Sequence, residues 1–201
     1  MKNNIYIFIF LFFFNISISS SVIAKEQFNF DVTEIEINEK GNKFKGLKRG
    51  KISTNNGIVL DADTFEYDKI SNILNASGNV ILKDEINDVT IISKNITYNK
   101  SEERIYTKSR SKAEGKNVII DADFFEYKKN LNTLDAIGNV ELEETLKDII
   151  LHSDHIIYYQ NSSKLVSKKK SEVFSDDLKI TAEEIEYNQI LNIINANSNV
   201  K

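Results

Sequence analysis

The residues best suited to acid–base chemistry are two pairs of aspartates. Asp61 and Asp63 form one pair, and the same pair recurs at Asp121 and Asp123. Paired carboxylates can transfer protons or bind calcium. However, the same motif occurs a third time with Thr181 in the first position, and an active site is rarely present in several near-identical copies. We therefore interpret these aspartates as outward-facing carboxylates beside a bend in a strand, and we expect no catalytic residue.

Metal and thiol chemistry has little support. The two histidines, His152 and His155, are three residues apart in a segment that we expect to be extended. In a regular strand that spacing puts the two side chains on opposite faces, which is poor geometry for a shared metal ion. The chain has no cysteine, which excludes disulfides, thiolate metal sites and cysteine nucleophiles. We predict no metal site and no cofactor.

Two clusters of basic residues could contact phosphate groups. One lies within residues 40–51 and includes Lys43, Lys48 and Arg49, and the other is residues 168–170. A phosphate on a lipid headgroup is one interpretation, and ordinary lysine-rich surface turns are the other. Across the chain 26 basic residues nearly balance 30 acidic ones, so no nucleic-acid partner is expected.

The elements that carry these residues belong to an internal repeat. Residues 57–82 and 117–142 are identical at 14 of 26 positions, and a third copy occupies residues 177–201. A second kind of unit lies between the copies and carries Tyr98 and Tyr158, which are again 60 residues apart. Self-similarity at a fixed spacing is typical of repeat architectures. The structural period is therefore about 30 residues.

Within each unit the apolar residues alternate with a period of two, which predicts strands. The face that begins at Ile58 changes parity before Tyr67, which predicts a β-bulge or sharp bend at Asp63, and likewise at Asp123 and Glu183. We expect an all-β fold built from repeated strands. Small residues such as Gly78 in the inward face predict spare room or a close approach of backbones.

The inward-facing positions of the copies define a candidate apolar trough. They either contact an apolar ligand or fill a dry core, and burial energy does not separate the two because each large side chain contributes about 1.5–3 kcal/mol in both cases. The candidate residues are Ile58, Leu60, Ala62, Phe65, Leu74, Ala76, Val80, Leu82, Ile120, Ala122, Phe125, Leu134, Ala136, Val140, Leu142, Ile180, Ala182, Ile185, Ile194 and Ala196.

The first residues are typical of a secretory signal peptide. Lys2 precedes an apolar run over residues 5–14, and small residues follow as far as Ala24. We predict cleavage after Ala24, which leaves one exported domain over residues 25–201. The alternative is an uncleaved membrane anchor, because residues 5–24 just reach the length of a spanning helix.

The repeat resembles a known family at its most specific residues. The segments DADTFEYD, from Asp61, and LNASGNVIL, from Leu74, resemble the OstA-like repeat of lipopolysaccharide transport proteins, LptA and the amino-terminal periplasmic domain of LptD. The resemblance covers residues 28–201. It implies an open, twisted β-jellyroll of antiparallel strand pairs in the periplasm, in which the trough residues contact the acyl chains of lipopolysaccharide and carry them toward the outer membrane. It also implies pairing with other β-jellyroll proteins of that machinery through edge strands.

Other interpretations remain open. A structural β-solenoid or adhesin-type surface protein without lipid binding would show the same periodicity, whereas a β-helix polysaccharide lyase or hydrolase is the weakest candidate. Within the family, the last strand stops at Val200, earlier than its copies. Either the edge of another protein completes the array, or the chain is the first part of an LptD-like protein. A complete LptA-like bridge is another possibility, and an LptC-like protein would need the uncleaved anchor.

Overall fold

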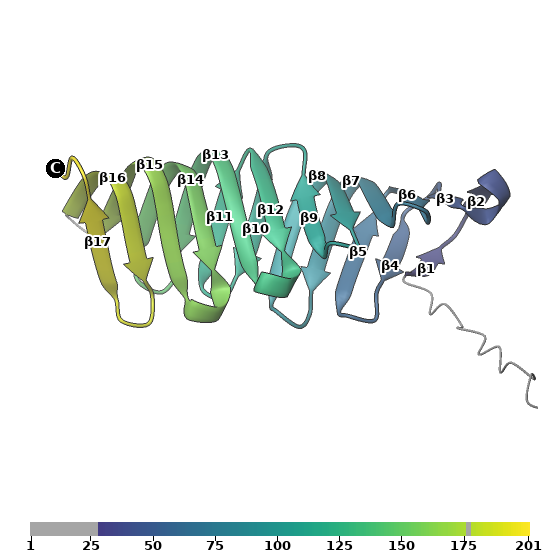
Figure 1. Ribbon diagram of the computed structural model, residues 1–201, viewed down its shortest axis with the longest axis horizontal. Helices are drawn as coiled ribbons and strands as arrows, with labels where there is room; N and C mark the ends of the chain where they lie inside the picture. The colour runs from purple at the N-terminus through teal and green to yellow at the C-terminus, as the bar shows by residue number, and fades with distance from the viewer. Residues whose placement is uncertain (1–27, 176–177) are drawn as a thin grey trace, which may run out of the picture.

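The computed structural model describes residues 28–175 and 178–201, which form one continuous stack of antiparallel strands (Figure 1). The all-β, antiparallel fold class is therefore confirmed. Three short 3-10 turns interrupt the strands in this part of the chain, η1 (Glu39–Gly41), η2 (Lys129–Leu131) and η3 (Gln160–Ser162). Among the described residues no helix has the length and apolarity needed to cross a bilayer. The predicted signal peptide lies outside the described residues.

The strands build two walls, and several long strands belong to both. Wall A contains β2 (Ile35–Asn38), β3 (Lys43–Gly46), β6 (Thr64–Asp68), β9 (Arg104–Thr107), β12 (Phe124–Lys128) and β17 (Ile193–Asn197). Wall B contains β1 (Asn29–Val32), β4 (Gly50–Ser53), β5 (Ile58–Ala62), β10 (Ser111–Gly115) and β11 (Val118–Ala122). The strands that contribute one half to each wall are β7 (Ile73–Asp84), β8 (Val89–Asn99), β13 (Thr133–Glu144), β14 (Ile149–Tyr159), β15 (Lys164–Ser175) and β16 (Leu178–Asn188).

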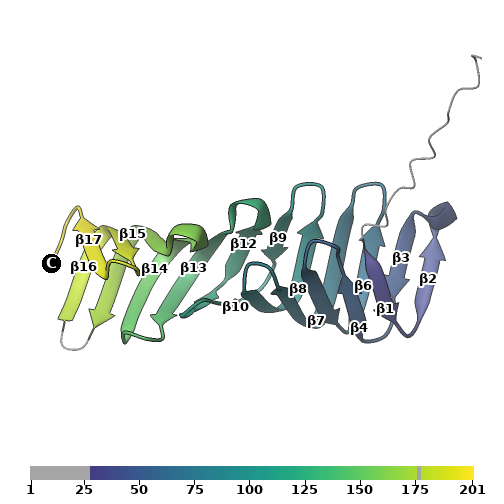
Figure 2. The ribbon, with the colours of Figure 1, turned by 90° about the horizontal axis from the view of Figure 1, so that it is seen from below.

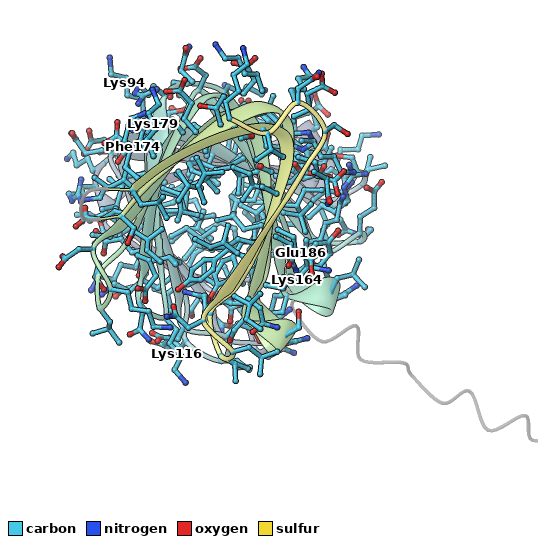
Figure 3. The ribbon with its side chains drawn as sticks, turned by 90° about the vertical axis from the view of Figure 1, so that its left-hand side faces the viewer. Lys94, Lys116, Lys164, Phe174, Lys179 and Glu186 are labelled. Carbon is cyan, nitrogen blue, oxygen red and sulfur yellow. The ribbon has the colours of Figure 1, made fainter. Side chains whose placement is uncertain are left out.

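A change of register bends each long strand from one wall into the other. In β7 the first half pairs with β6 and the second half with β5, and the register shifts between Ser77 and Val80. Comparable shifts interrupt the other ladders of long strands. We call this line of bends the corner. The end-on view shows Lys94 at the corner at the top and the walls on either side, with Lys164 on wall A and Lys179 on wall B (Figure 3).

The corner explains why the sequence places glycine in the middle of a strand. Gly78 and Gly138 have φ values of +77° and +79°, which residues with a side chain rarely adopt. In addition, a Cβ on Gly78 would lie 2.5 Å from Oδ2 of Asp63. The backbone N–H of Asp63 donates to the carbonyl oxygen of Gly78 at 3.0 Å. The predicted bend at Asp63 lies between β5 and β6, and the close backbone approach is the correct explanation of the small residue.

The two walls bury a common apolar interior. One cluster of buried side chains runs from Phe28, the first described residue, to Tyr187 in β16. Opposite the corner, the turns at the ends of the strands form two rows, which the view from below shows along the long sides of the stack (Figure 2). We call the row on wall A lip A (residues 69–72, 100–103, 129–132, 160–163 and 189–192) and the row on wall B lip B (residues 54–57, 84–88, 116–117 and 144–148, which include the last residues of β7 and β13). The line where they meet is the seam.

Candidate functional site: the apolar interior and its seam

The structure places the predicted trough residues on the inner faces of the two walls. Of the 20 positions, Ile180, Ile194 and Ala196 are partly exposed near the last strands. The other 17 are buried, each with an exposed fraction of 5% or less. Alternation along β5 and β7 puts these side chains on one face, because successive residues of a strand point to opposite sides. Whether they contact a lipid stays a prediction.

The units that lie between the copies of the repeat supply further buried residues, which the predicted trough residues did not include. Ile91 and Ile96 in β8, Ile105 in β9, Leu151 in β14 and Leu165 in β15 are all 2% exposed or less. The signal that could have found them was the 60-residue spacing of Tyr98 and Tyr158, which marks these units as full members of the repeat. The interior is therefore continuous from one 60-residue copy to the next.

The interior is closely packed around Leu134 and Tyr158. A cavity between the walls, lined by Val89, Ala113, Ile120, Leu134 and Tyr158 among others, has a volume of about 10 Å³. That is roughly the space for one water molecule. An acyl chain would therefore have to separate side chains that now touch, and the walls would have to move apart to admit it.

An aromatic cluster fills the interior at the β1 end of the stack. The ring of Phe28 packs edge-on against Tyr67 at a centroid distance of 4.7 Å and against Tyr98 at 5.9 Å. Phe30 stacks on Phe44 at 5.7 Å. Edge-on and stacked rings are favourable arrangements. This end of the trough is closed by packed rings in the described residues.

Side chains close the seam, and the best-connected group surrounds Asp84. Asp84 on lip B is fully buried and accepts hydrogen bonds from Lys129 Nζ at 2.7 and 2.8 Å and from Tyr127 Oη at 2.8 Å, both from wall A. Asn87 Nδ2 donates to it at 2.8 Å. Burial alone would raise the pKa of Asp84, but the hydrogen bonds from Lys129, Asn87 and Tyr127 and the charge of Lys129 hold it below its usual value.

A second polar group joins the lips nearer to β1. Asn56 Nδ2, on lip B, donates to Glu103 Oε2, on lip A, at 2.7 Å, and Tyr98 Oη donates to the same oxygen at 2.6 Å. Lys100 pairs with the other oxygen of Glu103. Burial, followed by the carboxylate of Glu103, raises the pKa of Tyr98. The two lips are thus tied by hydrogen bonds to carboxylates, which are stronger than bonds between neutral groups.

The corresponding group 60 residues later, around Glu144, is less complete. Glu144 on lip B is 1% exposed, and its Oε2 has no hydrogen-bond partner among the described residues. Lys147 Nζ donates across the seam to the carbonyl oxygen of Gln189 at 2.7 Å. Burial, with the charge of Glu144, raises the pKa of Tyr158 to about 12. Sequence reasoning missed these seam residues because their partners come from different copies.

The aspartate pairs stabilise the corner. Arg49 forms an ion pair with Asp61 at 2.6 Å and donates a hydrogen bond to Asp63 at 2.7 Å, and Asn79 donates to Asp63 at 2.8 Å. In the next copy Arg110 contacts Asp123 at 3.2 Å. Asp63 and Asp123 thus connect neighbouring corner residues, which agrees with the interpretation as structural carboxylates beside a bend.

The two histidines do not lie as the sequence predicted. A register shift between Ser153 and Ile156 separates them, so His152 and His155 both face outward, on wall B and wall A respectively. His152 lies opposite Glu141, and His155 Nε2 contacts Asp135 at 2.6 Å. The prediction of opposite faces was wrong because the bulge restores the parity of the strand. Within residues 28–175 and 178–201, no three His, Cys, Asp or Glu side chains are grouped to hold a metal ion.

The basic clusters are largely engaged on the surface. Lys43 pairs with Glu39 at 2.7 Å and Lys48 with Glu34 at 3.0 Å. Residues 168–170 are exposed at the corner, where the register of β15 shifts. These contacts fit lysine-rich surface turns, and the suggested phosphate contact stays a prediction.

The chain was compared with protein families, with curated proteins and with solved structures. No family model matches the chain, and no curated protein matches it. Among solved structures, the chain is similar to the crystal structure of LptH, described as the LptA homologous periplasmic component of the conserved lipopolysaccharide transport device from Pseudomonas aeruginosa. The TM-score is 0.31 and the identity 15%, and the match covers 70% of this chain and 82% of that chain.

Proposed function

We propose that this protein is a non-enzymatic periplasmic component of lipopolysaccharide transport that holds lipid acyl chains between its two walls on their way to the outer membrane. The observation that carries the proposal is the continuous apolar inner face, which extends across both 60-residue copies without a buried charge in its middle. Each CH₂ group of an acyl chain gains about 0.8 kcal/mol when it leaves water. A row of similar apolar sites therefore favours movement along the trough.

The open ends of the walls suggest the partners. In the described residues β17 pairs with β16 on one side and has no ladder on its other side. An unpaired edge can add a strand from another β-sheet protein. We propose that other β-jellyroll proteins of the same transport system pair there, and that the chain acts either as an LptA-like bridge or as the amino-terminal domain of an LptD-like protein.

A structural role without lipid is the second candidate, and the close packing of the interior favours it. The cavity beside Leu134 holds about one water molecule rather than an acyl chain. A β-solenoid or adhesin-type surface protein would keep such a core filled at all times. It would also be displayed on the cell surface, so its digestion by protease added to intact cells would separate this candidate from a periplasmic carrier.

Photo-crosslinking in growing cells tests the carrier directly. A photoreactive residue at Phe65 or Leu134, which are 3% and 5% exposed on the inner faces, should capture lipopolysaccharide. The matched control is Glu66, which neighbours Phe65 and lies on the outer face opposite Lys45. Capture from Glu66 but not from the two inner positions would refute the carrier.

A further inference from the structure

The seam is where the interior can open at the lowest structural cost. At the corner the backbone of each long strand runs unbroken from one wall to the other, for example through Lys94 of β8. Within each wall, neighbouring strands are joined by backbone ladders. Across the seam the described residues form no ladder, and the bonds between the lips start from side chains such as Asn56, Lys129 and Lys147. Opening the seam therefore breaks side-chain contacts alone.

The lips already present apolar side chains to the solvent. Ile86 and Leu131 flank the Asp84 group, and Leu146 and Leu191 occupy the same positions 60 residues later. These four side chains are between 63% and 70% exposed. Exposed apolar side chains lined up along a closed opening are suited to make the first contact with the apolar chain of an amphiphile.

The first and second copies differ at the residues that close the seam. The buried carboxylate is Asp84 in the first copy and Glu144 in the second, and the position of Lys129 is taken by Gln189. In the first copy the carboxylate has a cation on the opposite lip. In the second copy the nearby cation is Lys147, which lies on the same lip as Glu144 and bonds to the backbone of Gln189 instead.

This difference makes the second copy the easier one to open. Separation of Asp84 from Lys129 leaves two charges without their partners. By contrast, Glu144 keeps a buried oxygen without a hydrogen bond while the seam is closed, and opening returns that oxygen to water. A buried unpaired polar group disfavours the state that buries it. The closed seam is therefore least stable beside Glu144.

We propose that an acyl chain enters the interior through the seam of the second copy, beside Glu144, Lys147 and Gln189, while the Asp84–Lys129 pair keeps the first copy closed. The inference rests on the proposed function and adds to it the place of access. It follows that the identity of one residue per copy, lysine or glutamine at positions 129 and 189, determines which part of the trough opens.

Distances between spin labels on the lips test the place of opening. The chain has no cysteine, so two cysteines introduced at Leu146 and Leu191, or at Ile86 and Leu131, can be labelled uniquely. With purified lipopolysaccharide as the probe, the distance between labels at 146 and 191 should increase, and the distance between labels at 86 and 131 should change little. Equal widening at both pairs would overturn the inference.

Exchange of the two residues provides the matched variants. Gln189→Lys supplies the missing cation opposite Glu144 and should slow lipopolysaccharide binding about tenfold, the effect of one added bond between charged groups. The control Asn195→Lys adds the same charge on the outer side of β17 and should leave the rate within about twofold. In the double variant Lys129→Gln/Gln189→Lys the widening should move to the labels at 86 and 131.

The outcomes separate the inference from the function beneath it. If lipopolysaccharide binds but the exchange of residues 129 and 189 leaves both label distances and the binding rate unchanged, access at the second copy is wrong and the carrier function stands. If lipopolysaccharide binds neither the wild type nor any variant, the proposed function fails and the inference fails with it.

Discussion

Single residues decide where each strand leaves one wall for the other. Gly78 and Gly138 combine a positive φ with contact to an aspartate from the neighbouring strand, and the third copy has Ser198 in the same conformation, at φ +61°. The sequence indicated special glycines by their place in an apolar strand. The sequence could not show why glycine is needed, because the aspartates that contact Gly78 and Gly138 lie 15 residues earlier in the chain.

Gly78→Ala should therefore be costly. The added Cβ would lie 2.5 Å from Asp63, and the alanine would have to keep a φ that is unfavourable for it. We therefore expect the free energy of unfolding to fall by about 3 kcal/mol. Gly41→Ala is the control, because Gly41 has a φ of +90° with nothing within 4 Å of the added Cβ; it should lose about 1 kcal/mol. Urea unfolding measures both, and equal losses would show that contact with Asp63 is unimportant.

Asp84 should make stability depend on acid pH. Its folded pKa lies below its usual value, so its contribution is complete above the unfolded pKa of about 3.9 and is lost as the pH falls through the folded pKa. At about pH 7, Asp84→Asn should lower the free energy of unfolding by about 3 kcal/mol, because Lys129 stays buried without its partner. The difference from the wild type should shrink in acid. The same difference at both pH values would contradict this, and Glu66→Gln on the outer face serves as the control.

At the scale of elements, buried hydroxyl groups connect strands where the backbone ladder is disturbed near the corner. Thr107 at the end of β9 accepts the backbone N–H of Phe125 at 3.0 Å, and Ser167 in β15 accepts the N–H of Ile185 at 3.0 Å. The two hydroxyls are fully buried and 60 residues apart. They keep the N–H groups of β12 and β16 paired where the strands turn.

Thr107→Val tests this role. Valine has nearly the shape of threonine but cannot accept the hydrogen bond, so the N–H of Phe125 would stay buried and unpaired, at a cost of roughly 2 kcal/mol. Thr107→Ser keeps the hydroxyl that Ser167 has and should cost no more than about 1 kcal/mol, the loss of one methyl group. Thermal unfolding of the two variants compares them. An equal loss for both would assign the effect to packing.

The strands themselves were largely predictable, whereas their continuity was not. Alternation of apolar residues identified the extended segments and their inner faces, as at Ile58 and Leu60. In the first copy β9 and β10 are separate strands, but their equivalents in the second copy form the single strand β15. The difference depends on backbone geometry at residues 108–110 and 168–170, and both segments look like polar turns in the sequence.

At the scale of the whole molecule, β17 has no ladder on one side among the described residues, and we propose this edge as the place where another sheet pairs. Residues 194 and 196 face the interior, and residues 193, 195 and 197 are exposed on the other face. The seam was not predictable, because its partners, such as Asp84 and Lys129, are 45 residues apart and belong to different copies.

Ala196→Lys should weaken pairing at this edge. A charge that points inward from an edge strand opposes the addition of a further strand, because the added strand would bury it. Asn195→Lys places the same charge on the outer face one residue away and is the control. Sedimentation velocity over a range of concentrations should show less association for Ala196→Lys than for Asn195→Lys. Equal association would argue against pairing through β17.

The division of the long strands between two walls also makes the molecule extensible. Each 60-residue copy contributes four rungs to each wall, as from β5 through β10 in wall B and from β6 through β9 in wall A. With about 4.8 Å between neighbouring strands, one copy lengthens the stack by about 19 Å and leaves its cross-section unchanged. Each duplication of one 60-residue segment would therefore lengthen the stack by the same amount and would leave the fold unchanged.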